Sequence, residues 1–214
     1  MGDRPVTAVP DTEIRTLLAV LNGQRRHVLG ILDGLDADAL NKPVLPSGWS
    51  CLGLVQHLAL DVERFWFRAV FVGDENVIDT LDDTEDAWEV ASDTPAADIL
   101  HQYRTETELA DAVVTAATAD APLAWWPHHL FGEPHLHTLR DVLLHVITET
   151  ACHAGHLDAA RELIDGRRWL VLTLVEGLTQ KSATPSPLGT SRDPRGAGRP
   201  AGKGLSRNPD GRTG

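Results

Sequence analysis

Residues 45–74 read LPSGWSCLGLVQHLALDVERFWFRAVFVGD, and this stretch decides the fold. From Cys51 to Val72 its apolar side chains recur every three or four residues, which is the spacing of a helix that buries one face. Ser50 directly precedes this run and is a suitable N-cap residue. We therefore predict a helix over 51–72, entered through a turn that contains Pro46 and Gly48.

The same helical periodicity appears in three other segments. They run from Asp11 to Leu35, from Pro95 to Ala119 and from Thr138 to Asp165. Thr94 is expected to cap the segment that begins with Pro95. Thr138 and Asp141 have the spacing of a capping box, and Gly166 is a natural helix stop. No strand–helix alternation is visible, so we predict an all-α fold, an antiparallel four-helix bundle.

The chain divides by composition into four parts. Residues 1–10 are a flexible N-terminus, and residues 11–166 carry the bundle. Residues 167–180 form an apolar segment that could pack as a short helix or as a strand. Residues 181–214 are rich in Gly, Pro, Ser and Arg, a composition that cannot bury a core, and we predict a disordered basic tail.

Charge and apolar content exclude several functions for the body of the protein. Residues 1–166 hold 28 acidic against 10 basic residues, a net charge of −18, whereas residues 167–214 carry +6. An acidic body repels phosphates, so no nucleic-acid partner is expected for it. No apolar run is long enough to span a membrane, and neither a signal peptide nor a disulfide framework is visible. The sequence predicts a soluble, cytoplasmic protein.

Histidine is the unusual residue of this composition, with ten in the chain. His145, Glu149, His153 and His156 lie within about 80° of one another on a helical wheel and share this face with apolar residues. Glu149 and His153 are one turn apart and can reach a common point. His145 is about 12 Å along the axis from His153, too far for both to bind one metal ion. The last predicted helix therefore offers two ligands.

His57 is the remaining ligand candidate, because it is the one histidine of the helix predicted at 51–72. Together with Glu149 and His153 it would make a His2Glu site with an open position, a set typical of catalytic zinc. Spacing alone leaves two alternatives open. His57 could be a hydrogen-bonded core histidine, and Glu149 with His153 could be an ordinary surface pair.

Two motifs resemble the DinB-like superfamily. They are the stretch 45–74 quoted above and LLHVITETACHAGHLDAARELIDG at 143–166. The resemblance covers about residues 10–166 and is strongest to the branch called domain of unknown function 664, which includes mini-circle proteins. It implies a four-helix bundle that holds a divalent metal through His57, Glu149 and His153. In the ligand pair of the last predicted helix, Glu149 and His153, a Glu in the first position is typical of the related mycothiol-dependent maleylpyruvate isomerases.

The resemblance also implies a chemistry. A metal-dependent thiol S-transferase or isomerase would use a low-molecular-weight thiol, such as mycothiol, against an electrophile. His156 is the candidate catalytic side chain, facing the substrate or supporting a ligand. Zinc is the expected metal, and nickel, iron or manganese also suit the ligands. Such bundles commonly pair, so a homodimer is an open expectation. Two alternatives stay open, a non-enzymatic metal- or ligand-binding stress-related protein and a metal-assisted hydrolase.

Three secondary features have open interpretations. The segment APLAWWPHHLFGEPHLH at 121–137 could line the mouth of a pocket, or Trp125 and Trp126 could simply pack on the end of the bundle. Cys152 is expected to be a buried, inert thiol. Cys51 opens a helix whose dipole could lower the pKa of its thiol.

Overall fold

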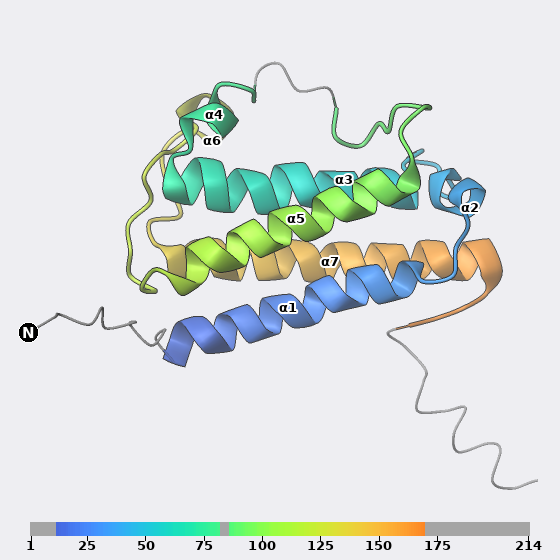
Figure 1. Cartoon of the computed structure of the whole chain (residues 1–214), viewed down its shortest axis with the longest axis horizontal. Coiled ribbons are helices and arrows are strands. Elements are labelled where there is room, and N and C mark those ends of the chain that lie inside the picture. Colours follow the sequence, from blue (N-terminus) through green and yellow to red (C-terminus); the bar gives the residue numbers. More distant parts are fainter. Residues whose placement is uncertain (1–11, 82–85, 170–214) are drawn as a thin grey trace, which may run out of the picture.

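The computed structural model describes residues 12–81 and 86–169, and these residues form helices without any strand. This confirms the all-α class. The long helices, shown in Figure 1, are α1 (Thr12–Leu32), α3 (Cys51–His57) with its continuation η1 (Leu58–Val72), α5 (Ala96–Thr115) and α7 (Leu139–Asp165). The predicted segments 1–10 and 181–214 lie outside the described residues.

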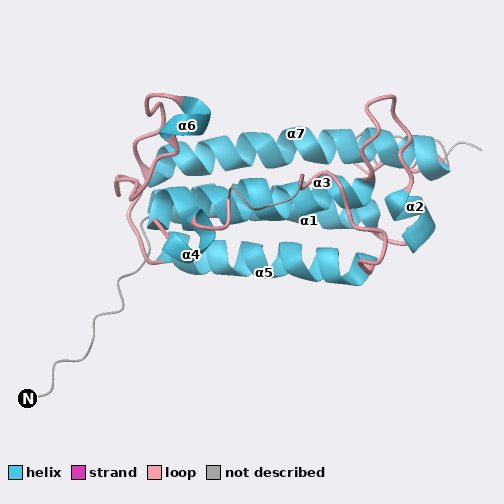
Figure 2. Ribbon diagram, turned by 90° about the horizontal axis from the view of Figure 1, so that it is seen from above, coloured by secondary structure: helices cyan, strands magenta, loops and turns pink. Residues whose placement is uncertain are grey.

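The bundle consists of two pairs of helices that run in opposite directions. In Figure 1, α1 and α7 run one way, while α3 with η1, and α5, run the other way. α7 packs against α1 on one side and against α3 and η1 on another, and α5 packs against α3 and η1. Since η1 and α5 point in the same direction, the chain must return along the bundle between them, and residues 73–81 and 86–95 belong to this return (Figure 2).

The helix predicted at 51–72 has the expected extent and an unexpected winding. Its first part, α3, is an α-helix, and from Leu58 onward it is π-helical. A π-helix is wider because each N–H bonds to the carbonyl five residues back, and such segments are frequent at functional sites. The change of winding follows directly after His57. Apolar periodicity did not predict it, because the buried residues of η1, such as Leu58, Val62 and Trp66, still recur every three to four residues.

Three short helices were not predicted. They are α2 (Ala37–Asn41), α4 (Glu75–Ile78) and α6 (His128–Phe131). Helices of four or five residues are too short to show a periodic pattern. α4 and α6 lie at the same end of the bundle, above the C-terminal end of η1 in Figure 1.

The caps of the two helices that matter for the site are confirmed. Ser50 Oγ accepts a hydrogen bond from Gly53 N at 3.0 Å, and Thr138 with Asp141 forms a reciprocal capping box at the start of α7. Gly166 ends α7 with a left-handed φ of 77°, where a residue without Cβ is favoured. The prediction that Thr94 caps α5 is wrong. The cap position is occupied by Pro95, and no side chain caps this helix end.

The start of the segment 167–180 packs back onto the bundle. Trp169 N donates to Asp158 Oδ1 at 2.6 Å, and the Trp169 ring lies against Gly30 of α1. A Cβ at Gly30 would overlap this ring, so the absence of a side chain there lets the tryptophan approach. Residues 167–169 are neither helix nor strand, and the rest of the segment lies outside the described residues.

Candidate functional site

The candidate site lies where α7 crosses α3 and η1. His57 is the last residue of α3, and Glu149 and His153 lie one turn apart in the middle of α7. The caps described above fix where α3 and α7 begin. The packing of α7 on α3 and η1 then determines which side chains of the two helices face each other. The sequence placed the three residues on these helices, and in the structure His153 contacts both His57 and Glu149.

The two histidines are direct neighbours. The ring centroids of His57 and His153 are 5.1 Å apart in an edge-on arrangement, and Glu149 Oε2 lies 3.5 Å from His153 Nε2. The histidine side chains are only 16% and 12% exposed, while Glu149 is 39% exposed. Burial, and then the neighbouring His57, lower the pKa of His153. Its imidazole therefore favours the neutral form, which has a lone pair available for a ligand.

A further side chain contacts Nδ1 of each imidazole. His57 Nδ1 lies 2.8 Å from Asp61 Oδ2, one turn along the same helix. His153 Nδ1 lies 3.4 Å from His156 Nδ1. In both rings Nδ1 is thus engaged; Nε2 of His57 is left for a ligand, and Nε2 of His153 faces the Glu149 carboxylate. A metal-binding histidine usually has this kind of partner on its second nitrogen.

The pairwise geometry fits a divalent cation. Two imidazoles bound through nitrogen at about 2 Å to one ion have ring centroids roughly 5 Å apart, and His57 and His153 are 5.1 Å apart. Across the described residues, however, no three His, Cys, Asp or Glu side chains converge as a ready-made metal cage. The three side chains therefore provide the donor types and the histidine spacing of a His2Glu site without forming a closed cluster.

His145, the fourth polar residue of the predicted stripe, belongs to a different environment. Its ring centroid lies 4.4 Å from that of Trp66, and burial is the main cause that lowers its pKa. This agrees with the prediction that His145 is too distant to share an ion with His153. The Trp66 ring in turn contacts Trp126 and Phe131, which form an aromatic cluster at the end of the bundle.

The open question about the segment 121–137 is answered in favour of packing. Trp126 is buried and donates from Nε1 to the carbonyl of Gly132 at 2.9 Å. The backbone N–H groups of Ala124 and Trp125 donate to carbonyls at the C-terminal end of η1. This segment covers the end of the bundle.

Both expectations about the cysteines are wrong. Cys152 is exposed, because it lies on the side of α7 that turns away from the core. Cys51 is buried, and this burial raises the pKa of its thiol to about 11, so desolvation outweighs any effect of the helix dipole.

Sequence reasoning missed two aromatic residues of the site, Trp49 and Trp88. The Trp88 ring stacks on His57 with centroids 4.3 Å apart, and the Trp49 ring lies 6.4 Å from His156. Trp49 directly precedes the Ser50 cap, so its position in the sequence was a usable signal. Trp88 lies in the return segment 73–95, where no periodic pattern predicts which side chain faces the bundle.

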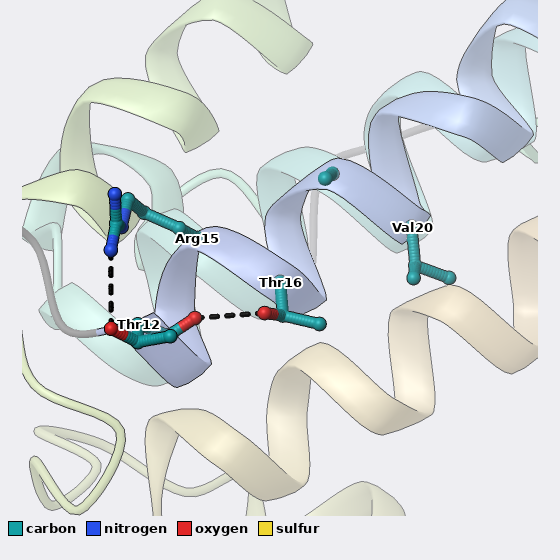
Figure 3. Close-up of a pocket in the computed structure, with 5 residues that line it drawn as sticks. Thr12, Arg15, Thr16 and Val20 are labelled. Carbon is teal, nitrogen blue, oxygen red and sulfur yellow. Dashed lines mark hydrogen bonds between the residues drawn. The ribbon is translucent and has the colours of Figure 1, made fainter.

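A separate surface hollow lies on the N-terminal half of α1 (Figure 3). It is lined by Thr12, Arg15, Thr16, Ala19 and Val20. Arg15 and Thr16 are held by hydrogen bonds to Thr12. None of the candidate site residues lines this hollow.

Taken together, the fold and the site define a helical-bundle protein with two imidazoles and a carboxylate gathered between helices. A family model described as Mycothiol-S-transferase matches residues 16–166, and the chain belongs to this family. The match covers the four long helices almost completely and supports thiol S-transferase chemistry related to mycothiol. No match was found among curated proteins or among solved structures. Within the described ranges, no helix has both the length and the apolar character to cross a membrane.

Proposed function

We propose that this protein is a metal-dependent mycothiol S-transferase, which joins the sulfur of mycothiol to a carbon electrophile. One observation carries the metal-dependent part of the proposal. The rings of His57 and His153 make a T-shaped contact with centroids 5.1 Å apart, and the Glu149 carboxylate lies beside His153. Family membership supports the choice of thiol and favours transfer over isomerisation as the reaction.

His57, Glu149 and His153 would hold the divalent ion, for which zinc is the first candidate and nickel, iron or manganese are alternatives. When bound, such an ion would favour the thiolate form of the thiol at neutral pH, and the thiolate is the reactive form. Asp61 would keep the His57 ring in the orientation that directs Nε2 toward the site, since it lies 2.8 Å from Nδ1.

In the proposed reaction the thiolate sulfur attacks the electrophilic carbon. A carbon–sulfur bond forms, the bond to the leaving group breaks, and the leaving group departs with the bonding electron pair. The thiol proton is released to water or to a side chain at the site. We propose His156 as the catalytic side chain that faces the substrate, because it is exposed, contacts His153 and lies next to Trp49.

Several finer assignments belong to the same proposal. They are the relationship to the domain of unknown function 664 branch, a cytoplasmic location and the pairing of two copies. The acidic body also makes small neutral molecules better partners than nucleic acids.

A turnover assay tests this proposal. Purified protein would be supplied with zinc, mycothiol and iodoacetamide, and formation of the thioether would be followed by mass spectrometry. We expect turnover by the wild type and a loss of at least about 100-fold in kcat/KM for His57→Ala, Glu149→Ala and His153→Ala, the scale on which essential groups act. His101→Ala is the matched control, because His101 is exposed on α5, away from the site.

Two results would contradict the proposal. The wild type would be assayed with zinc, nickel, iron and manganese in turn. If it accelerates the reaction with none of these metals, compared with mycothiol and electrophile without protein, it is not a transferase for this thiol. Metal binding without turnover would instead favour the non-enzymatic binding protein. If the three variants turn over as fast as His101→Ala, the metal-dependent mechanism is wrong.

A further inference from the structure

We infer that Trp88 and Trp49 form an aromatic wall that binds the electrophile, and that this wall selects uncharged, flat, ring-containing electrophiles. The inference rests on the proposed transferase function and adds the class of the second substrate. We call these two side chains the aromatic wall.

Trp88 is in contact with both histidines of the candidate metal site. Its ring lies nearly parallel to that of His57, with centroids 4.3 Å apart and an angle of 20° between the planes. The same indole lies 5.7 Å from the ring of His153. A molecule bound beside both histidines would therefore also lie close to the indole.

Trp49 continues the wall toward His156. Its ring centroid lies 6.5 Å from that of Trp88, with the planes tilted by 57°, and 6.4 Å from that of His156. Both tryptophans are half-buried, so each keeps part of its surface accessible to a ligand. Rings bind to such surfaces by offset stacking or edge-on contact, and aliphatic groups gain less from them.

The aromatic wall is anchored to α3 through Trp88 and its chain neighbours. Gln56 Nε2 donates to the carbonyls of Ala87 and Glu89, at 3.0 and 3.2 Å. The carbonyl oxygen of Trp88 comes so close to Gly53 that a Cβ there would be only 2.2 Å away. Asp86 Oδ1 also accepts from the backbone N–H of Trp88 at 3.0 Å. Because of these contacts, the indole position is set by α3, one turn before His57.

The charges around the aromatic wall favour an uncharged electrophile. Asp61 and Glu149 flank the two histidines, with exposed fractions of 51% and 39%. Asp86, at the backbone of Trp88, adds a third carboxylate. A bound divalent ion would balance two of these carboxylates and leave no surplus positive charge for an anionic electrophile, and a stacked indole prefers a flat ring. An aryl halide with a neutral activated ring has both properties.

The inferred step is an aromatic substitution. The thiolate sulfur of mycothiol attacks the ring carbon that bears chloride, the carbon–sulfur bond forms, and the carbon–chlorine bond breaks. Chloride leaves with the electron pair, and the thiol proton is released to solvent. The reaction consumes one thiol and one aryl chloride and needs no oxidant or reductant.

The test compares two electrophiles and one unreactive probe. For wild type and Trp88→Leu, kcat/KM would be measured with 1-chloro-2,4-dinitrobenzene, which is aromatic, and with iodoacetamide, which is small and aliphatic. We expect the ratio of the two values to fall about three- to ten-fold in Trp88→Leu, the range of a lost aromatic contact. Trp88→Phe keeps a flat ring and should retain most of the ratio. Trp169→Leu, which removes another half-exposed tryptophan, should leave it unchanged.

Binding of 1,3-dinitrobenzene, which has no leaving group, gives a second readout without turnover. Its dissociation constant, from quenching of tryptophan fluorescence, should rise about three- to ten-fold in Trp88→Leu and not in Trp169→Leu. If circular dichroism shows that Trp88→Leu is unfolded, Gln56→Ala replaces it, since it releases the segment that carries Trp88.

The outcomes separate the two proposals. Unchanged ratio and unchanged binding of 1,3-dinitrobenzene would overturn the aromatic wall even if the enzyme is active. In Trp88→Leu, the KM for mycothiol could instead rise with both electrophiles while the ratio of their kcat/KM values stays unchanged. This result would overturn the inference, because the two tryptophans would then bind the thiol and not the electrophile. If wild type shows no turnover while binding of the probe still depends on Trp88, the transferase function fails and the ring-binding wall remains.

Discussion

Two clusters of polar side chains lie inside the same bundle. In one of them an arginine of the chain supplies the positive charge, and in the other a bound cation would have to supply it. In the first cluster, Arg25 of α1 donates from Nε to Glu63 Oε1 of η1 at 2.7 Å and contacts both Asn22 and Asp111. Arg25 and Glu63 are almost completely buried. The chain itself supplies both signs of charge there, so the cluster is complete as a structural element.

The second cluster gathers His57, Glu149 and His153. Burial lowers the pKa of His153, so its imidazole favours the neutral form with a lone pair, and a carboxylate lies beside it. Lone pairs and a carboxylate suit a cation from outside the chain. The difference suggests a criterion for polar groups inside a bundle, namely whether the chain itself supplies both the positive and the negative charges of the cluster. A buried pair that balances its own charge is complete within the fold, whereas donors without a cation of their own are the basis of the proposed site.

The largest expected effect comes from breaking the first cluster. Arg25→Met leaves Glu63 buried without its cation, and we expect the free energy of unfolding to fall by about 3–5 kcal/mol. The double variant Arg25→Met/Glu63→Leu removes both charges and should recover most of this loss. Urea unfolding curves followed by circular dichroism measure both.

Equal stability of Arg25→Met and wild type would show that Glu63 is not held by Arg25. It would then remove the distinction between a structural cluster and a site. A double variant that is as unstable as the single one would show that the cluster acts through packing and not through charge balance.

A smaller effect, on the affinity for zinc, is expected from Asp61, which contacts His57 of the second cluster. Asp61→Asn keeps the shape of the side chain and removes the charge at His57 Nδ1, so the affinity for zinc should fall about ten- to hundred-fold. Competition with a chromophoric chelator measures the dissociation constant. Asp93→Asn, in an exposed turn, is the control. An unchanged affinity in Asp61→Asn would mean that Asp61 does not position His57 for a metal.

The smallest expected effect concerns the reactivity of the two cysteines. One of them is part of the core, and the other lies on the surface of α7. Cys51 is buried with a thiol pKa of about 11, and Cys152 is exposed on α7. At pH 8, brief treatment of folded protein with iodoacetamide should modify one thiol per chain, located at Cys152 by peptide mass spectrometry. Cys152→Ser should abolish this modification. Equal labelling of both cysteines in the folded protein would show that the core around Cys51 opens readily.

Much of the fold was predictable because long amphipathic helices carry a strong signal. The extent of 51–72, the Ser50 cap and the Thr138–Asp141 capping box followed from local residue patterns. The π-helical winding of η1 left no mark in the apolar spacing, and the short helices α2, α4 and α6 span too few residues to show a periodic pattern. Thr94 shows the limit of cap signals, since a suitable residue beside Pro95 remained unused.

For the site, the sequence predicted which residues are neighbours along a helix and which helices carry them. The contacts of His153 with Glu149 and His156 follow from helical spacing. Its contact with His57 depends on how α7 crosses α3, and here the family resemblance gave the prediction. Neither source predicted Trp88, because its position is set by the anchoring of the return segment to Gly53 and Gln56.

The most direct test of the central claim is the metal content of the protein. Wild type, the three single alanine variants of His57, Glu149 and His153, and the control His101→Ala would be incubated with zinc, freed of excess metal and analysed by mass spectrometry. We predict about one zinc ion per chain in wild type and His101→Ala, and a loss of zinc in each of the three folded site variants. A folded wild type that binds no zinc, nickel, iron or manganese, or three variants that retain the metal, would contradict the assignment of this site.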